Sequence, residues 1–216
     1  MARRAPPDDC PSPLGPIRET LPIGTVLWRI HWNGFEPTGF NPRPATGKRE
    51  PGRFDSIDGD FAYLYAGETR RTVFAEVFLR GETVLASTVR IVPRRRLENL
   101  RLSRLVTAGE LELVLLIGAE ALGRIGQDAW LTSCDEHDYP LTEEYARTIR
   151  RWAPWAAGFV WLAKRDNAHR SCVLFADRVK PTALSGEMKL ELDGDGEAFT
   201  RGMLARLSVA LEDPAS

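Results

Sequence analysis

The sequence TVLWRIH, residues 25–31, alternates between two sets of side chains and predicts an early β-strand. One face of this strand would carry Val26, Trp28 and Ile30. Because successive side chains of a strand point to opposite faces, Arg29 and His31 would share the other face with Leu27. Arg29 therefore belongs to a strand but not to its apolar side.

A long connection rich in proline, glycine and basic residues follows. It contains FNPRP at residues 40–44 and PGRFD at residues 51–55, and it fits neither the helical nor the strand period. Long ordered loops in compact domains are usually functional or mobile. We therefore expect this connection to contribute to a functional site.

The next stretch predicts a second strand at residues 61–66, a turn at Gly67 and a helix that begins near Thr69. The hydroxyl of Thr69 is suited to cap the first turn of that helix. The buried stripe of the helix is predicted to be Val73, Phe74, Val77 and Phe78. Glu76 lies off this stripe, where a carboxylate is available for chemistry.

These elements together resemble the RES domain family, which takes its name from Arg, Glu and Ser. The resemblance is carried by Arg29 in an early strand, by the Gly-Arg-Phe turn at residues 52–54, and by Tyr65 placed eleven residues before Glu76. Residues 139–152, 157–161 and 173–178 look like later elements of the family. The resemblance covers roughly residues 20–205.

What the resemblance implies is a fold similar to ADP-ribosyltransferases and an activity that consumes NAD. It also implies the role of a toxin in a bacterial toxin–antitoxin pair, with a small helical antitoxin as protein partner. No Gly-x-Gly-x-x-Gly fingerprint occurs in the chain, so a Rossmann cradle and hydride transfer are unsupported. NAD would then be a substrate, and no cofactor is expected.

The residue types fit such chemistry. Planar guanidinium groups bind phosphate oxygens with paired, charge-assisted hydrogen bonds, so Arg29 and Arg53 are the predicted clamp for a pyrophosphate. Cleavage of the nicotinamide–ribose bond passes through an oxocarbenium-like transition state, which the carboxylate of Glu76 would stabilise. Tyr65 would either stack on the nicotinamide ring or hydrogen-bond a ribose or phosphate oxygen. The predicted catalytic residues are Glu76, Tyr65 and Arg29, and the predicted substrate-binding residues are Arg29, Arg53 and Tyr65.

Each of these residues also has an ordinary structural interpretation. Arg29 would be a solvated or salt-bridging strand residue, and Arg53 would pair with Asp55 or Asp58. Glu76 would pair with Arg80 one helical turn later, an interaction worth about 0.3–0.5 kcal/mol. Tyr65 would be a core residue whose hydroxyl finds one partner.

The chain departs from the family at the serine. The position that corresponds to it is Ala163, which is followed by Lys164, Arg165 and Asp166. Ser171, at the start of the next predicted strand, is another serine that could approach the same cleft, but it is not ranked with Arg29, Tyr65 and Glu76. An alternative function is therefore a catalytically impaired RES-like module that binds a nucleotide or a protein.

The rest of the chain predicts one α+β domain with a single mixed sheet. Of the 216 residues, 43% are hydrophobic, which is enough for one sizeable core. We expect an extended, proline-rich arm at residues 1–22, the domain at residues 23–212 and a tail at residues 213–216. The remaining predicted elements are strands at 111–117, 159–162, 172–175 and 189–194 and helices at 119–125, 141–152 and 199–211, with the strands at 159–162 and 172–175 forming a hairpin.

Charge and cysteine usage favour a cytoplasmic protein. The formal net charge is −1 and the pI is near 6.3, so no overall field attracts the chain to nucleic acid or to an anionic membrane. An arginine-rich stretch at residues 90–104 is expected to be a solvated surface or to face acidic groups. Three scattered cysteines fit neither a metal site nor a disulfide framework, and no apolar run is long enough to span a bilayer.

Overall fold

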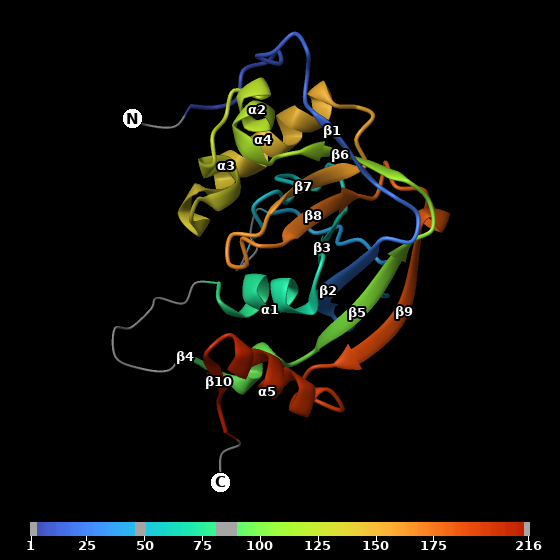
Figure 1. Cartoon of the computed structure of the whole chain (residues 1–216), viewed down its shortest axis with the longest axis vertical. Helices are drawn as coiled ribbons and strands as arrows, with labels where there is room; N and C mark the ends of the chain where they lie inside the picture. Colours follow the sequence, from blue (N-terminus) through green and yellow to red (C-terminus); the bar gives the residue numbers. More distant parts are fainter. Residues whose placement is uncertain (1–3, 46–50, 81–89, 214–216) are drawn as a thin grey trace.

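The computed structural model describes residues 4–45, 51–80 and 90–213. Within them, eight strands form one sheet in the order β1-β6-β7-β8-β3-β2-β5-β9 (Figure 1). β6 and β7 pair in parallel and the other neighbours pair antiparallel, so the sheet is mixed. The strands are β1 (Arg18–Leu21), β2 (Val26–Trp32), β3 (Tyr63–Gly67), β5 (Leu100–Thr107), β6 (Leu111–Leu115), β7 (Gly158–Leu162), β8 (Arg170–Phe175) and β9 (Leu184–Glu191).

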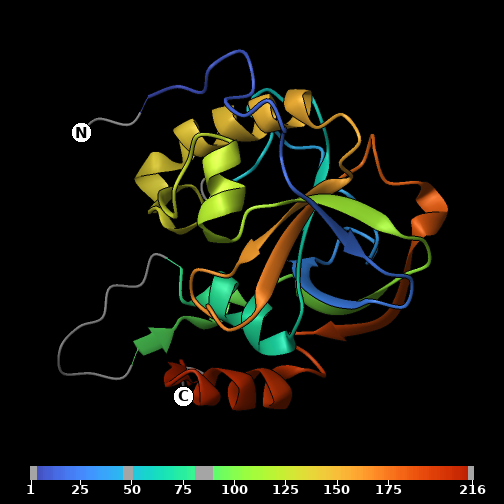
Figure 2. The ribbon, with the colours of Figure 1, turned by 45° about the horizontal axis from the view of Figure 1, so that its top comes forward.

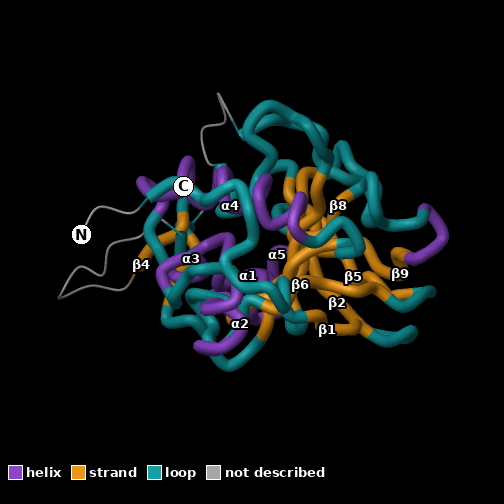
Figure 3. The backbone as a smooth tube through the Cα atoms, turned by 90° about the horizontal axis from the view of Figure 1, so that it is seen from above, coloured by secondary structure: helices purple, strands orange, loops and turns teal. Residues whose placement is uncertain are grey.

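The parallel pair β6–β7 needs a crossover, because parallel neighbours cannot be joined by a tight turn. Residues 118–152 supply it with three helices and a short 3-10 turn. Seen from above, the labelled helices lie largely to one side of the strands (Figure 3). The crossover contains α2 (Gly118–Arg124), α3 (Trp130–Ser133), η2 (Glu136–Asp138) and α4 (Tyr139–Trp152).

Helix α1 (Arg70–Phe78) begins where the sequence predicts. The side-chain oxygen of Thr69 accepts a hydrogen bond from the backbone N–H of Thr72, which satisfies one of the free donors of the first turn. Phe74 and Phe78 are fully buried and pack against Trp28 of β2. The helix therefore covers the β2 end of the sheet.

Three clusters of buried side chains divide the core. One lies between the crossover helices and the face of the sheet that carries Phe159, Trp161 and Val173. A second lies on the opposite face, around Leu64 and Leu174. The third joins α1, β2, β5 and the C-terminal helix α5 (Glu197–Arg206). Helices α4 and α1 thus cover neighbouring parts of the sheet, and α5 closes the lower end of the molecule (Figures 1 and 2).

Most predicted elements are confirmed, and the differences have physical causes. The predicted helix at 199–211 ends at Arg206, because Ser208 takes a left-handed backbone conformation with φ 57° that turns the chain. Residues 209–211 then form β10 (Val209–Leu211), which pairs in parallel with β4 (Arg90–Val92). Of the predicted strand at 189–194, residues 189–191 are the end of the longer edge strand β9, and residues 192–194 belong to the turn that follows it.

The N-terminal segment is tied to the domain earlier than the predicted boundary at residue 22. Residues 18–21 form the edge strand β1, which pairs with β6. Upstream of it, Tyr145 and Trp152 of α4 donate hydrogen bonds to the backbone carbonyls of Arg4 and Asp8. The segment at residues 4–17 therefore follows the crossover helices without secondary structure of its own beyond turns.

The arginine-rich stretch at residues 90–104 is largely used inside the molecule. Arg94 pairs with Glu197, Arg101 with Glu191 and Arg104 with Glu187. The acidic groups that it faces therefore belong to the same chain.

None of the helices in the described part of the chain is both long enough and apolar enough to cross a membrane.

Candidate active site

A pocket of about 220 Å³ opens on the helix-covered face of the sheet, between α1 and the start of α4. Its floor is formed by strand residues, because Ile30, Tyr65, Trp161 and Ser171 all lie on this face. One wall comes from α1 and the other from the start of α4. The lining residues are Ile30, Gly52, Arg53, Tyr65, Ala66, Val73, Glu76, Val77, Arg80, Tyr139, Trp161, Arg165 and Ser171.

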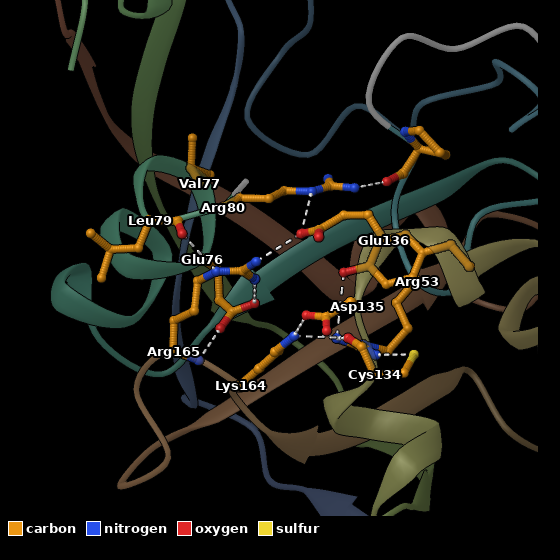
Figure 4. Close-up of polar contacts among 12 residues, drawn as sticks. Arg53, Glu76, Val77, Leu79, Arg80, Cys134, Asp135, Glu136, Lys164 and Arg165 are labelled. Atoms are coloured by element: carbon orange, nitrogen blue, oxygen red, sulfur yellow. Dashed lines mark hydrogen bonds and ion pairs between the residues drawn. The ribbon is translucent and has the colours of Figure 1, made fainter. Parts of the chain in front are cut away.

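Glu76 presents its carboxylate to this pocket from α1. Its Oε1 atom accepts a hydrogen bond of 2.7 Å from the backbone N–H of Arg165, and Oε2 lies 3.7 Å from the Arg165 guanidinium (Figure 4). The side chain remains 26% exposed, so the carboxylate can still meet a ligand. The ion pair of Glu76 is therefore with the β7–β8 loop rather than with Arg80, the partner that helical spacing alone would assign.

The same loop holds helix α1 at both ends. Asp166 accepts hydrogen bonds from the hydroxyl of Thr72 at 2.8 Å and from Arg71 at 2.9 Å, in the first turn of α1. At the other end, Nε of Arg165 donates to the carbonyl of Leu79 at 3.0 Å. The position of Glu76 relative to the sheet is thus fixed by contacts on either side of it.

A second carboxylate, that of Glu136, lies between two arginines of the pocket. Its Oε1 atom is 2.7 Å from Nη2 of Arg165 and 3.6 Å from Nε of Arg80 (Figure 4). Burial by itself would raise the pKa of Glu136, but a backbone hydrogen bond and Arg165 outweigh it and lower that pKa below its usual value. Glu136 is therefore a carboxylate at neutral pH.

Tyr65 is held by groups behind the pocket. Its hydroxyl accepts a hydrogen bond of 2.8 Å from the backbone N–H of Phe54 and also contacts the carboxylate of Asp55. Burial, with the negative charge of Asp55 next in importance, raises the pKa of Tyr65 well above its usual value. The phenol therefore stays protonated, and its hydroxyl is already engaged by Phe54 and Asp55.

Steric contacts explain why the first residue of the Gly-Arg-Phe turn, Gly52, is a glycine. A Cβ atom at Gly52 would lie 2.4 Å from Oδ1 of Asp55 and 2.8 Å from the hydroxyl oxygen of Tyr65. Both distances are far inside van der Waals contact. Glycine at this position lets the loop backbone approach the Tyr65–Asp55 pair closely.

Arg53 lines the pocket, but its guanidinium group also supports the wall. It donates to the sulfur of Cys134 at 2.8 Å and to the carbonyl of the same residue at 3.1 Å. Its charged end also stacks on Tyr139, 4.9 Å from the ring centroid. Neither Asp55 nor Asp58 is its hydrogen-bond partner among these contacts, and Asp58 pairs with Arg147 instead.

Arg29 is not brought to this pocket. It lies on the opposite face of β2 from Ile30, is only 5% exposed, and donates to the backbone carbonyls of Pro37 and Gly39 at 2.8 and 2.7 Å. Burial lowers its pKa to about 9, which leaves it charged at neutral pH. The predicted clamp of Arg29 and Arg53 is therefore not the arrangement in the structure, where Arg29 secures the loop that follows β2.

Of the two positions considered for the family's serine, only Ser171 lines the pocket. Ser171 pairs directly with Trp161 and Gly67 across the sheet, which places it on the face that carries Tyr65. Ala163 is fully buried at the end of β7 and is not among the lining residues.

Comparison with known proteins identifies the family. The family model described as "RES domain" matches residues 26–196. The chain belongs to the RES domain family. No functionally curated protein matches it.

A solved structure shares the fold of this RES domain. It is titled "Crystal structure of the M.tuberculosis MbcT-MbcA toxin-antitoxin complex", and the match has a TM-score of 0.59 at 16% sequence identity. The match covers 86% of this chain and 92% of that chain, so the likeness extends over nearly the whole fold. At this identity the match establishes the α+β fold class predicted from the sequence.

The structure assembles the RES domain's pocket from more residues than the sequence pattern indicates. Arg53, Tyr65 and Glu76 meet there as expected. Arg80, Tyr139, Trp161 and Arg165 also line the pocket, and sequence reasoning did not single them out. The one available signal was the position of Arg165, two residues after Ala163, in a loop between two apolar strands.

Proposed function

We propose that this RES domain consumes NAD by cleaving the bond between nicotinamide and ribose, through hydrolysis, phosphorolysis or transfer of ADP-ribose. The single observation that carries the proposal is the pocket itself. In it, the Glu76 carboxylate faces a cavity walled by Tyr65, Tyr139 and Trp161 and rimmed by arginines. Aromatic walls with a few convergent charged groups are typical of sites for small organic ligands.

Each part of the pocket has a role in the proposed reaction. The aromatic rings of Tyr65 and Trp161 would hold the flat nicotinamide ring. As the glycosidic bond lengthens, positive charge develops on the ribose, and the carboxylate of Glu76 would stabilise it. Arg80 and Arg165, joined by Arg53, would attract the pyrophosphate. These roles use the surroundings of Glu76 as they stand and require no movement of the sheet.

The size of the cavity fits one end of a dinucleotide. A volume of about 220 Å³ is smaller than the roughly 300–1,000 Å³ of most whole-ligand pockets. The nicotinamide and its ribose would occupy the pocket, and the pyrophosphate and adenosine would extend past the arginines at its rim.

We further propose that the protein acts as a toxin in the cytoplasm and is controlled by an antitoxin. The fold match to a chain from a toxin–antitoxin complex supports this role. A small helical antitoxin that covers the pocket would be the partner. The three free cysteines are compatible with a reducing compartment.

One observation favours a second candidate, a RES domain that binds a nucleotide or protein without turnover. Ala163, the position that we assign to the family's serine, has a side chain that is buried and does not line the pocket. If the serine hydroxyl is required and Ser171 does not replace it, the site would bind NAD without releasing nicotinamide.

The test is nicotinamide release from NAD by the purified chain, with and without phosphate. The wild type is expected to release nicotinamide, and Glu76→Ala is expected to lose at least about 100-fold of the rate. A phosphate requirement would identify phosphorolysis. A folded wild type that releases no nicotinamide in the presence of phosphate would contradict the proposed enzymatic activity and favour the binding module.

A further inference from the structure

The rim of the pocket holds more positive than negative charge. Arg53, Arg80 and Arg165 line it, whereas the carboxylates in contact with them are those of Glu76 and Glu136. Three guanidinium groups against two carboxylates leave one positive charge in excess. The side chains of Arg80 and Arg165 are only 19% and 12% exposed, so solvent screens this charge less than it would at an open surface.

Arg80 and Arg165 each have a backbone anchor in addition to their contact with Glu136. Arg165 donates from Nε to the carbonyl of Leu79 at 3.0 Å, and Arg80 donates from Nη2 to the carbonyl of Pro51. Figure 4 shows the two guanidinium groups approaching the same oxygen of Glu136 from separate anchor points. Removing that oxygen would leave both arginines in place.

Glu136, in contrast, lies on a short and partly exposed element. It belongs to the three-residue turn η2 and not to a strand or a longer helix, and its side chain is 35% exposed. A single carboxylate oxygen that contacts two guanidinium groups imitates one oxygen of a phosphate. A pyrophosphate carries more charge and more acceptor oxygens than a carboxylate, so it competes well for such a pair.

We propose that Arg80 and Arg165 are the phosphate-binding pair of this pocket, and that the carboxylate of Glu136 is an internal counter-anion that an incoming phosphate displaces. Glu136 thereby weakens the binding of phosphate-bearing ligands. It sets how much ligand is needed to fill the site. That the natural ligand is a dinucleotide rests on the proposed function, whereas the exchange of anions does not.

Isothermal titration of the full chain with ADP-ribose and with inorganic pyrophosphate tests this exchange. ADP-ribose carries the pyrophosphate but has no nicotinamide, so no turnover interferes. Glu136→Gln keeps the size of the side chain and removes its charge. It is expected to tighten the binding of both ligands about two- to fivefold at low ionic strength, the range for one partly exposed ion pair. Arg80→Gln is expected to weaken both.

Two controls isolate the phosphate. Asp135→Asn removes the neighbouring carboxylate, which is 69% exposed and pairs with Lys164, and is expected to change neither affinity. Adenosine, which lacks phosphate, is expected to respond to neither Glu136→Gln nor Arg80→Gln. Thermal melts of each variant would confirm that the chain remains folded.

An unchanged or weakened affinity of Glu136→Gln for ADP-ribose and pyrophosphate would overturn the proposal. So would a wild type and a Glu136→Gln variant that bind neither ligand. The proposed function fails in a different way, by the absence of nicotinamide release. If the chain binds phosphate as predicted but releases no nicotinamide, the role of Glu136 as a counter-anion is supported and the proposed cleavage of NAD is contradicted.

Discussion

The backbone N–H of Arg165 donates a hydrogen bond of 2.7 Å to Oε1 of Glu76, so the main chain of the β7–β8 loop orients the carboxylate of α1. A side chain on a helix surface ordinarily samples several rotamers. This contact, with the Arg165 guanidinium nearby, restricts Glu76 to an orientation that faces the pocket. The predictions below test what that orientation does and what surrounds it.

Glu76→Gln is expected to reduce nicotinamide release by about 100-fold or more while the protein stays folded. The amide oxygen of glutamine can still accept the hydrogen bond from Arg165, but the negative charge that would stabilise an oxocarbenium-like transition state is gone. Initial rates with NAD and a thermal melt of the same sample measure the two effects. Full activity in Glu76→Gln would remove Glu76 from the mechanism.

Gly52→Ala is expected to destabilise the chain by about 1–3 kcal/mol, because the added methyl group would overlap Asp55 and the hydroxyl of Tyr65. The matched control is Gly202→Ala in α5, where nothing lies within 4 Å of the added Cβ. There the better helix propensity of alanine should stabilise the protein by up to about 1 kcal/mol. Urea denaturation of both variants gives the comparison, and equal effects would contradict the close approach at Gly52.

Ser171→Ala is expected to lower nicotinamide release and to leave the melting temperature nearly unchanged. Ser171 is the serine that lines the pocket, and alanine removes only its hydroxyl. Ser185→Ala, on the edge strand β9, is the control and should keep full activity. Unaltered kinetics in Ser171→Ala would show that this hydroxyl has no part in the reaction.

Ala163→Ser places a serine at the position that we assign to the family's serine, which is fully buried. We expect it to cost about 1–3 kcal/mol of stability, because a hydroxyl group would be added at a closed position. No gain in activity is expected, since the side chain at 163 does not line the pocket. A clear rise in nicotinamide release would instead show that the loss of the serine had impaired the enzyme.

Because the pKa of His31 is lowered in the folded chain, we expect the protein to lose stability in mild acid. Burial, with the positive charge of Arg29 next, lowers its pKa to about 4, so between about pH 6.5 and pH 4 the unfolded chain binds a proton that the folded chain does not. The free energy of unfolding should therefore fall as the pH drops through this window, by on the order of 3 kcal/mol from this residue.

Urea denaturation at pH 7.5, 5.5 and 4.5 measures that loss, with His31→Gln as the comparison. Glutamine can replace the contacts of the ring with Ser103 and with the backbone of Trp32, but it does not titrate. The variant should therefore show a shallower dependence on pH. Parallel curves for the two proteins would mean that His31 is not the group responsible.

Local patterns predicted the elements well because each carries its own signal. The alternation at residues 25–31 specifies β2, the hydroxyl of Thr69 specifies the start of α1, and the apolar runs on either side of residues 164–170 specify a hairpin. The closing helix was predicted too long, because an apolar period of three to four does not reveal a left-handed residue such as Ser208.

The site was predictable only in part. Alternation in a strand shows which residues share a face, but it does not show which face a distant element covers. Alternation separates Arg29 from Ile30, but it does not say that α1 and the pocket lie on the side of Ile30. Likewise, Glu136 is sixty residues from Glu76 along the chain, and only the crossover between β6 and β7 brings it to the same arginines. Contacts of this kind have no local pattern.

The hydrogen bond from the loop to Glu76 also bears on how the sequence can vary. A main-chain donor is present whatever the side chain, with proline as the exception. Residue 163 can therefore change while the carboxylate keeps this hydrogen bond, provided that the path of the backbone is preserved. Natural selection at residue 163 would then act on the shape of the loop more than on the identity of that side chain.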